Sequence, residues 1–229
     1  MLPPRHWLRR VASSGPHARG WTHLTAGRPP VSPARVQSTS RVGAVCRAGE
    51  VRLWSRNGKD FTTKFPDVQA ALADQVDIDC VLDGELVVWT GDRMDFDALQ
   101  QRMVNTATTV RRRLAPGQPA SLVVFDVLAV DSVDVRPMRW TARRKRLESL
   151  AEAWRPPLQL SPVTADVAEA REWLEAFKAS GVEGLVVKGA TTRYLPGRRD
   201  WIKVNSLGVG SARPRRRGCL VPGQVAGVG

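Results

Sequence analysis

The segment Val81–Trp89 constrains the fold more than any other part of the chain. It is an apolar run interrupted by Asp83, Gly84 and Glu85. Because side chains alternate across a strand, Asp83 and Glu85 point to the same face. Two carboxylates in an apolar strand are costly unless cations or hydrogen-bond donors face them, and Gly84 allows close approach of a ligand or another backbone. Taken alone, the segment favours a solvent-facing strand end or a tight turn. The rest of the chain changes that interpretation.

The positive charge of the chain is concentrated at its two ends. The formal net charge is +13 over 229 residues, a length that is sufficient for one domain with a substantial core. Residues 50–200 carry 22 basic and 22 acidic side chains, whereas 8 basic residues precede this range and 5 follow it, with no acidic residue in either flank. This distribution indicates a charge-balanced body with basic tails.

Several classes of protein are disfavoured by composition. No apolar run is long enough to span a membrane. Cys46, Cys80 and Cys219 have neither zinc-site spacing nor a disulfide framework, which fits a reducing cytosol. All three histidines lie in the first 23 residues, so a histidine-based catalytic site in the body is excluded.

Three domain segments are expected. Residues 1–40 are rich in Arg, Pro, Ser and Gly and lack acidic residues, which is typical of a disordered basic tail. A targeting peptide, or non-native sequence from a wrong start or a shifted frame, would have a similar composition; poor amphipathic spacing ranks targeting last. Residues 206–229 repeat the pattern and are expected to form a second basic tail. Residues 41–205 form the predicted domain.

The body is predicted to be α+β, with antiparallel sheets and flanking helices. Hydrophobic periodicity and turn residues predict strands at 42–47, 51–55, 80–89, 121–130, 182–188 and 201–204. The unbroken apolar run at 121–130 indicates a central strand. Helices are predicted from Pro66, at 95–103, at 141–154, and from Thr164 as N-cap to Gly181.

Four further segments place polar groups in or beside strands. They read Ser-Arg-Asn-Gly at 55–58, Phe-Asp-Val-Leu at 125–128, Glu-Gly-Leu-Val-Val-Lys at 183–188 and Trp-Ile-Lys at 201–203. Together with Asp-Gly-Glu at 83–85, in this order and spacing, they resemble the adenylation domain of ATP-dependent DNA ligases, in particular the bacterial break-repair type. Any one of these motifs alone would be weak.

The resemblance implies a role for each candidate residue. ATP-binding roles fall on Glu85, which would hold the ribose hydroxyls with Asp83 supporting it, on Phe125 at the adenine, and on Lys188 and Lys203 at the phosphates. Glu183 would help to coordinate Mg²⁺, and Arg56 and Asn57 would lie near a nicked DNA end. Arg41 matches the arginine that closes the family's lysine motif, and is a catalytic candidate together with Lys188 and Lys203.

The chemistry of nucleotidyl transfer agrees with these residue types. The reaction spreads negative charge over phosphate oxygens, which fixed cations and a metal stabilise, and carboxylates supply oxygen ligands to Mg²⁺. Each residue singly has an ordinary alternative: Phe125 as core, Lys203 as an edge lysine, Arg56 as a turn residue. Their joint occurrence in order favours the functional interpretation.

The chain departs from the family pattern at the lysine motif, Lys-x-Asp-Gly-x-Arg. Aligned through Arg41, the nucleophilic lysine belongs at position 36, where the chain has Val36, and Ser38 and Thr39 replace the aspartate and glycine. A valine cannot act as a nucleophile. The sequence after residue 205 also does not resemble the oligonucleotide-binding barrel of the family.

Two functional hypotheses follow, with a third as an alternative branch. The first is an ATP-dependent DNA ligase by descent, acting on nicked or broken DNA in repair and recombination, and expected to be a cytoplasmic, nucleoid-associated bacterial monomer without membrane attachment. The second is a non-catalytic ATP- or nucleic-acid-binding relic. The RNA-capping or RNA-ligase branch is the third; the sequence Leu53–Gly58 favours the DNA-ligase branch.

Overall fold

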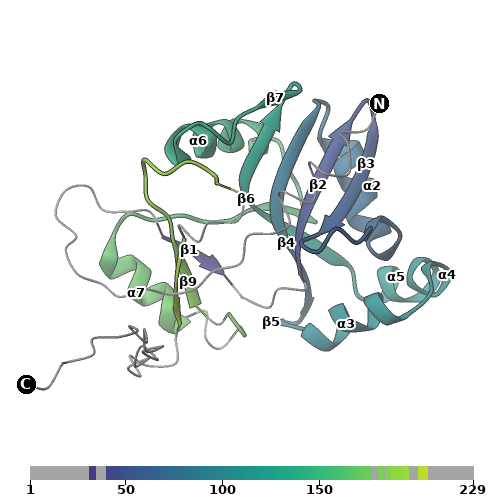
Figure 1. The fold of residues 1–229 in the computed structure, drawn as a ribbon. Helices are drawn as coiled ribbons and strands as arrows, with labels where there is room; N and C mark the ends of the chain where they lie inside the picture. The colour runs from purple at the N-terminus through teal and green to yellow at the C-terminus, as the bar shows by residue number, and fades with distance from the viewer. Residues whose placement is uncertain (1–30, 35–39, 177–179, 183, 196–200, 206–229) are drawn as a thin grey trace, which may run out of the picture.

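A seven-stranded, mostly antiparallel sheet forms the centre of the molecule (Figure 1). The structure, a computed structural model, describes residues 31–34, 40–176, 180–182, 184–195 and 201–205. The sheet has the order β3-β2-β4-β6-β7, with β5 paired to β4 and β8 parallel to β6. Its strands are β2 (Arg41–Arg47), β3 (Glu50–Ser55), β4 (Cys80–Thr90), β5 (Arg93–Met94), β6 (Ala120–Val130), β7 (Val133–Asp134) and β8 (Leu158–Leu160).

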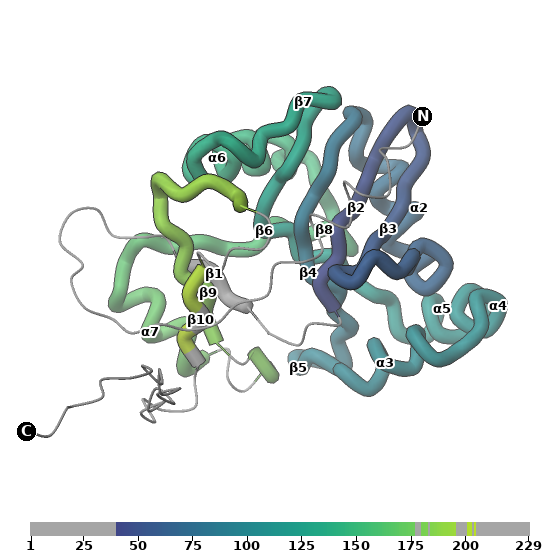
Figure 2. Tube along the Cα trace, in the orientation of Figure 1, coloured from purple at the N-terminus to yellow at the C-terminus, as the bar shows by residue number. Residues whose placement is uncertain are grey.

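A second, three-stranded antiparallel sheet lies beside the first (Figure 2). Its central strand β9 (Gly184–Val187) pairs with β1 (Val31–Ala34) on one side and β10 (Ile202–Asn205) on the other. The helical elements are η1 (Thr62–Lys64), α2 (Pro66–Gln75), α3 (Phe96–Val104), α4 (Ala107–Thr109), η2 (Val110–Leu114), α5 (Ala115–Gly117), α6 (Trp140–Ala151) and α7 (Val167–Ala176).

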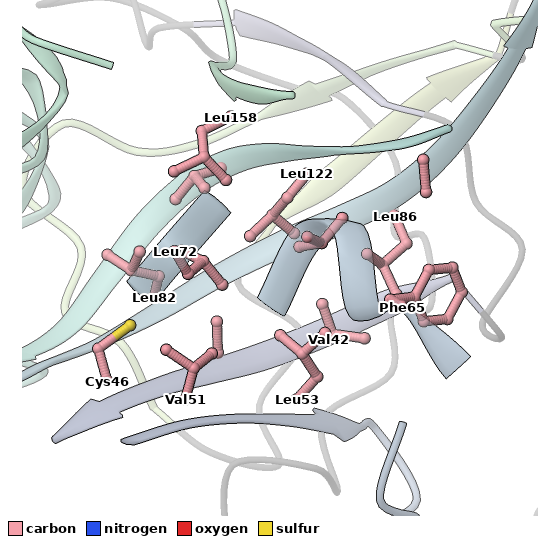
Figure 3. Close-up of a cluster of buried hydrophobic side chains, with 14 of the residues drawn as sticks. Val42, Cys46, Val51, Leu53, Phe65, Leu72, Leu82, Leu86, Leu122 and Leu158 are labelled. Atoms are coloured by element: carbon pink, nitrogen blue, oxygen red, sulfur yellow. The ribbon is translucent and has the colours of Figure 1, made fainter. Parts of the chain in front are cut away.

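The main hydrophobic core covers one face of the large sheet. Alternate residues of β4, such as Leu82 and Leu86, pack there with Leu72 of α2 and Leu122 of β6 (Figure 3). Phe65, which directly precedes α2, is fully buried in the same cluster. Burial of this face leaves the opposite face of β2 and β4 to carry Asp83 and its neighbours.

The α+β class and the main strands are confirmed, and β6 is an interior strand as its apolar run predicts. The predicted N-cap at Thr164 is wrong: α7 begins at Val167, and Asp166 accepts a hydrogen bond from the backbone N–H of Ala168 (2.7 Å). The helix ends at Ala176. Residues 177–179 lie outside the described residues, and Gly181, where the helix was predicted to stop, has φ +81°.

Several elements lie where the sequence predicts no regular structure: the short strands β1, β5, β7 and β8, the turn η1 and the helical segment 107–117. The helical segment 107–117 was not expected because it lacks apolar periodicity. Strand β1 lies within residues 1–40, and the remainder of that predicted tail, apart from Ser40, lies outside the described residues, as does 206–229. The three-segment division therefore stays a prediction.

No helix among the described residues is long and apolar enough to cross a membrane.

Gly84 is required because β4 and β6 approach each other closely at this position. A Cβ at this position would lie 2.9 Å from the carbonyl oxygen of Val123 and 3.0 Å from a methyl carbon of Leu122. The pairing of β4 with β6 shifts register between Asp83 and Gly84, and again between Val81 and Leu82. The glycine therefore serves backbone packing beside an irregularity in the sheet.

We expect Gly84→Ala to lower the free energy of unfolding by about 1–3 kcal/mol, because the added methyl group overpacks against the β6 backbone. Urea unfolding followed by circular dichroism measures this. Gly43→Ala on β2 is the matched control, since a Cβ there meets nothing within 4 Å. Equal stability of the two variants would contradict the close approach.

Candidate nucleotide-binding site

Asp83 and Glu85 lie on the face of β4 opposite the main core, as strand alternation predicts. Val81, on the same face, belongs to a smaller cluster with Val45 and Tyr194. Asp83 is 2% exposed. Glu85 is half-buried and accepts a hydrogen bond from the hydroxyl of Ser40 (2.6 Å). Asp83 thus faces into the molecule and Glu85 is partly covered, in contrast to the interpretation of the segment taken alone.

Arg41 neutralises Asp83 in a two-point interaction. Its Nε donates to Oδ1 of Asp83 (2.9 Å), and its Nη2 donates to Oδ2. The hydroxyl of Tyr194 donates to the same Oδ2 (3.0 Å) and accepts from Nη2 of Arg41 (3.1 Å). Burial lowers the pKa of Arg41, but the attraction of Asp83 outweighs it and the pKa is raised overall. Burial, followed by the charge of Asp83, raises the pKa of Tyr194, so its hydroxyl stays protonated.

Aromatic rings and a second cation adjoin this pair. Phe125 and Trp201 meet edge to face with centroids 5.8 Å apart, and the guanidinium of Arg41 lies 5.2 Å from both rings. Nζ of Lys188 lies 4.7 Å from the Phe125 centroid and 4.2 Å from that of Trp201, and donates to the backbone carbonyl of Phe125 (3.0 Å). Burial lowers the pKa of Lys188 to about 8, although Asp126 and Asp83 oppose the shift.

An irregular pairing of β6 brings two consecutive side chains to the site. Gly84 pairs with Val124 and Asp83 with Asp126, which leaves Phe125 as the extra residue of a β-bulge. Asp126 therefore stands directly across from Asp83. It is fully buried and forms a bidentate ion pair with Arg143 of α6 (2.8 and 2.9 Å). Each of the two facing carboxylates thus has its own arginine.

Arg56 and Asn57 lie in the tight turn after β3, next to the start of β2 because Val42 pairs with Ser55. Gly58 has φ +74°, as the turn requires. Arg56 is half-buried, and its pKa is lowered by burial and by the positive charge of Arg41. Asn57 is exposed. The turn therefore adds positive charge at the rim of the site.

The structure brings together Arg41, Asp83, Phe125 and Lys188 of the predicted set, with Glu85 beside them on the same strand face. Glu183 lies outside the described residues. Lys203 pairs with Val186 in β10, and its side chain also lies outside the description. Within the described parts of the chain, no three Asp, Glu, His or Cys side chains gather as a metal site would require.

Sequence reasoning missed Asp126, Arg143, Tyr194 and Ser40, and gave Trp201 no role. Asp126 stands in the Phe-Asp-Val-Leu motif without a predicted role, although a lone carboxylate in an apolar run is a usable signal. Tyr194 is the single tyrosine of the chain, but nothing in its local pattern indicates that it reaches β4, 111 residues away.

The fold is that of a DNA-ligase adenylation domain. The chain superposes on the ligase domain of Mycobacterium tuberculosis LigD with a TM-score of 0.59 and 28% identity, over 80% of this chain and 57% of that one. It superposes on a mycobacterial DNA ligase D complexed with ATP and MES with a TM-score of 0.57, 28% identity, and 80% and 58% coverage. Residues 40–205 match the ATP dependent DNA ligase domain, and the chain belongs to this family.

Curated relatives of the chain are also DNA ligases. The chain is 32% identical to DNA ligase C of Mycobacterium tuberculosis (strain H37Rv) over 214 residues, which cover 85% of this chain and 58% of the relative. It is 37% identical to DNA ligase C1 of Mycolicibacterium smegmatis over 164 residues, with 68% and 45% coverage. The chain thus spans about half the length of the curated relatives that it matches.

The lowered pKa of Lys188 predicts a pH-dependent stability. Because the unfolded lysine titrates near 10.5 and the folded one near 8, the unfolded state binds more protons between these values. The destabilising effect of charged Lys188 is fully present below pH 8 and is relieved as pH rises toward 10.5. Relative to Lys188→Met, the wild type should gain up to about 3 kcal/mol between pH 7 and 10.5, at about 1.4 kcal/mol per pKa unit.

Urea unfolding of both proteins across this range measures the difference. Lys145→Met removes an exposed lysine of α6 and serves as the control, with a difference from wild type that stays flat. A flat difference for Lys188→Met as well would show that Lys188 is not desolvated.

Proposed function

We propose that the face formed by β2, β4 and β6 with Lys188 binds ATP, and that the protein functions in the line of ATP-dependent DNA ligases acting on nicked or broken DNA. The observation that carries this proposal is the convergence of Arg41, Glu85, Phe125 and Lys188, from distant segments, around one buried aromatic and ionic cluster. Repair and recombination, a monomeric state and a cytoplasmic, nucleoid-associated location belong to the same proposal.

Each residue has a specific role in the proposal. Glu85 holds the ribose hydroxyls and Asp83 supports it through the shared strand, while Phe125 walls the adenine. Lys188 and Lys203 face the phosphates, and Arg56 and Asn57 contact the DNA end. Glu183 would contribute a carboxylate to Mg²⁺, which when bound would neutralise phosphate charge.

Open space and unbalanced charge both support a bound anion. Gly43 of β2 pairs with Asp83 and leaves space above it, since an added Cβ meets no atom within 4 Å. The charge of Asp126 is already matched by Arg143 and that of Asp83 by Arg41. With Glu85 as the remaining carboxylate, Lys188 and Arg56 leave one positive charge in excess near the site. Burial lowers the pKa of both groups, and a bound anion would oppose that shift.

Chemistry is a separate question from binding. The family reaction begins when a lysine nitrogen attacks the α-phosphorus of ATP and pyrophosphate leaves, which gives a lysyl-AMP. With Val36 at the aligned position, we propose that the chain as written binds ATP but does not form this adduct. A non-catalytic ATP- or nucleic-acid-binding protein is the second candidate, and the missing lysine motif is the observation that favours it.

The lysine motif can be restored by substitution. We expect wild-type protein to gain no AMP mass after incubation with ATP and Mg²⁺, because no lysine occupies position 36. The variant Val36→Lys, Ser38→Asp, Thr39→Gly should gain one AMP, located by peptide mapping at residue 36. Intact-protein mass spectrometry measures both. The same triple variant with Lys188→Met is the control for an intact site, and it should lose the adduct.

An adduct on the wild-type chain would contradict the alignment at position 36. A restored motif that gains no AMP, although the variant binds ATP as the wild type does, would favour the non-catalytic binder.

The role of Phe125 in nucleotide binding can be tested directly. Phe125→Ala should weaken ATP binding roughly tenfold, since loss of an aromatic contact costs about 0.5–1.5 kcal/mol beyond buried area. Quenching of tryptophan fluorescence reports binding because Trp201 adjoins Phe125. Phe96→Ala, in a residue that packs against the main core, is the control. Equal affinities of the two variants would place the nucleotide elsewhere.

A further inference from the structure

Three consecutive arginines stand on an unusual helical turn that the proposed site does not use. Elements α4, η2 and α5 follow one another without a break over residues 107–117, and η2 (Val110–Leu114) is a π-helix. Short π-helical insertions are rare and frequently occur at functional sites. Val110 and Ala115 are buried and anchor the segment, whereas Arg111, Arg112 and Arg113 are all exposed.

The charge of this segment, the η2 patch (Arg111–Arg113), is not balanced locally. No acidic residue occurs between Asp97 and Asp126 in the sequence. Among the described residues, none forms an ion pair with the η2 patch, whereas the nearby Arg102 is buried and paired with Asp67 (2.8 Å). Arg102 therefore serves the fold, and the η2 patch offers its guanidinium groups to solvent.

The surroundings of the η2 patch are concave. Arg111 lines a groove of about 740 Å³ whose lining also includes Arg52, Thr63 and the carboxylates Glu50 and Asp60. Asp60 is already paired with Arg52 (3.5 Å). Thr106 and Thr108, just before the patch, are exposed. Figure 2 shows α4 and α5, which flank the η2 patch, on the opposite side of the molecule from β9, the strand that directly precedes Lys188. Guanidinium and hydroxyl groups are the usual partners of DNA phosphates.

We propose that the η2 patch is a second phosphate-contacting surface, which binds the backbone of duplex DNA away from the nucleotide site. Guanidinium groups match phosphate oxygens with two parallel hydrogen bonds. The wider π-turn gathers the three consecutive side chains more nearly onto one side than an α-helix would. Such contacts hold the duplex without reading its sequence. The choice of DNA as the polyanion rests on the proposed function; the surface itself does not.

The test compares two charge-matched variants of the full chain. One variant replaces Arg111, Arg112 and Arg113 by Ala. The control replaces Arg139, Lys145 and Arg146, three exposed cations at and within α6, also by Ala. Binding of a fluorescent nicked duplex is measured by anisotropy as a function of salt concentration. The basic tails contribute equally to every protein.

The η2 variant should lower the slope of log affinity against log salt by about 2–3, at about 0.9 per phosphate contact, and should weaken binding at low salt at least tenfold. The α6 control should keep the wild-type slope. Replacing the three arginines by Lys keeps the charge and should retain most of the slope, which separates loss of phosphate contacts from loss of folding.

Equal slopes for the two Ala variants would overturn the proposal, because the effect would then be one of total charge. The proposal would also be overturned if the η2 variant lost affinity for poly-glutamate and kept its affinity for DNA, because that result would indicate an acidic protein partner. The η2 variant should bind ATP like the wild type. If Phe125→Ala leaves ATP binding unchanged but the η2 slope falls as expected, the proposed nucleotide site fails and the DNA surface stands.

Discussion

The buried carboxylate of Asp83 is the interaction on which the site depends. A carboxylate at 2% exposure in a central strand is unstable unless cations and donors surround it. Arg41 from β2 and the hydroxyl of Tyr194 meet this demand, and they join β2 and β4 to the segment after β9. Removal of Arg41 would leave the buried charge of Asp83 unmatched, which typically costs several kcal/mol. The ionic contact therefore also fixes how the segment after β9 sits against the large sheet.

The part of the site that the sequence predicts is the part set by local geometry. Asp83 and Glu85 share a face because β4 keeps regular register with β2, so the period of two holds. Phe125 and Asp126 break that period because β6 is bulged against β4. A bulge is a property of two strands together, and an apolar run in one of them does not reveal it. Hydrophobic periodicity predicts the main strands and α2, α3 and α6. The helical segment 107–117, rich in Thr and Arg and ending in Pro-Gly, has no such periodicity.

Contacts over long sequence separations account for the other residues that were missed. Tyr194 and Arg143 reach the site through the packing of distant segments, and the ring of Tyr194 lies over the Arg143 guanidinium (5.8 Å). This contact links the two carboxylate–arginine pairs into one cluster. Pattern reasoning identified residues whose motif is contiguous, such as Lys188, but a side chain that acts only through such a cluster has no contiguous motif to carry the signal.

The described contacts bear on how ATP binding and the covalent step are separated in the proposed function. Arg41–Asp83, Ser40–Glu85 and Lys188–Phe125 are made without any residue from positions 35–39. Among the described residues, the cluster is held by ion pairs, hydrogen bonds and ring contacts between segments that are far apart in the sequence. In the proposed function, the cluster with Lys188 and Arg56 favours a bound phosphate, whereas the covalent step depends on a lysine at position 36, where the chain has valine. Under that proposal, the replacement removes the covalent step and keeps the contacts that we propose bind ATP.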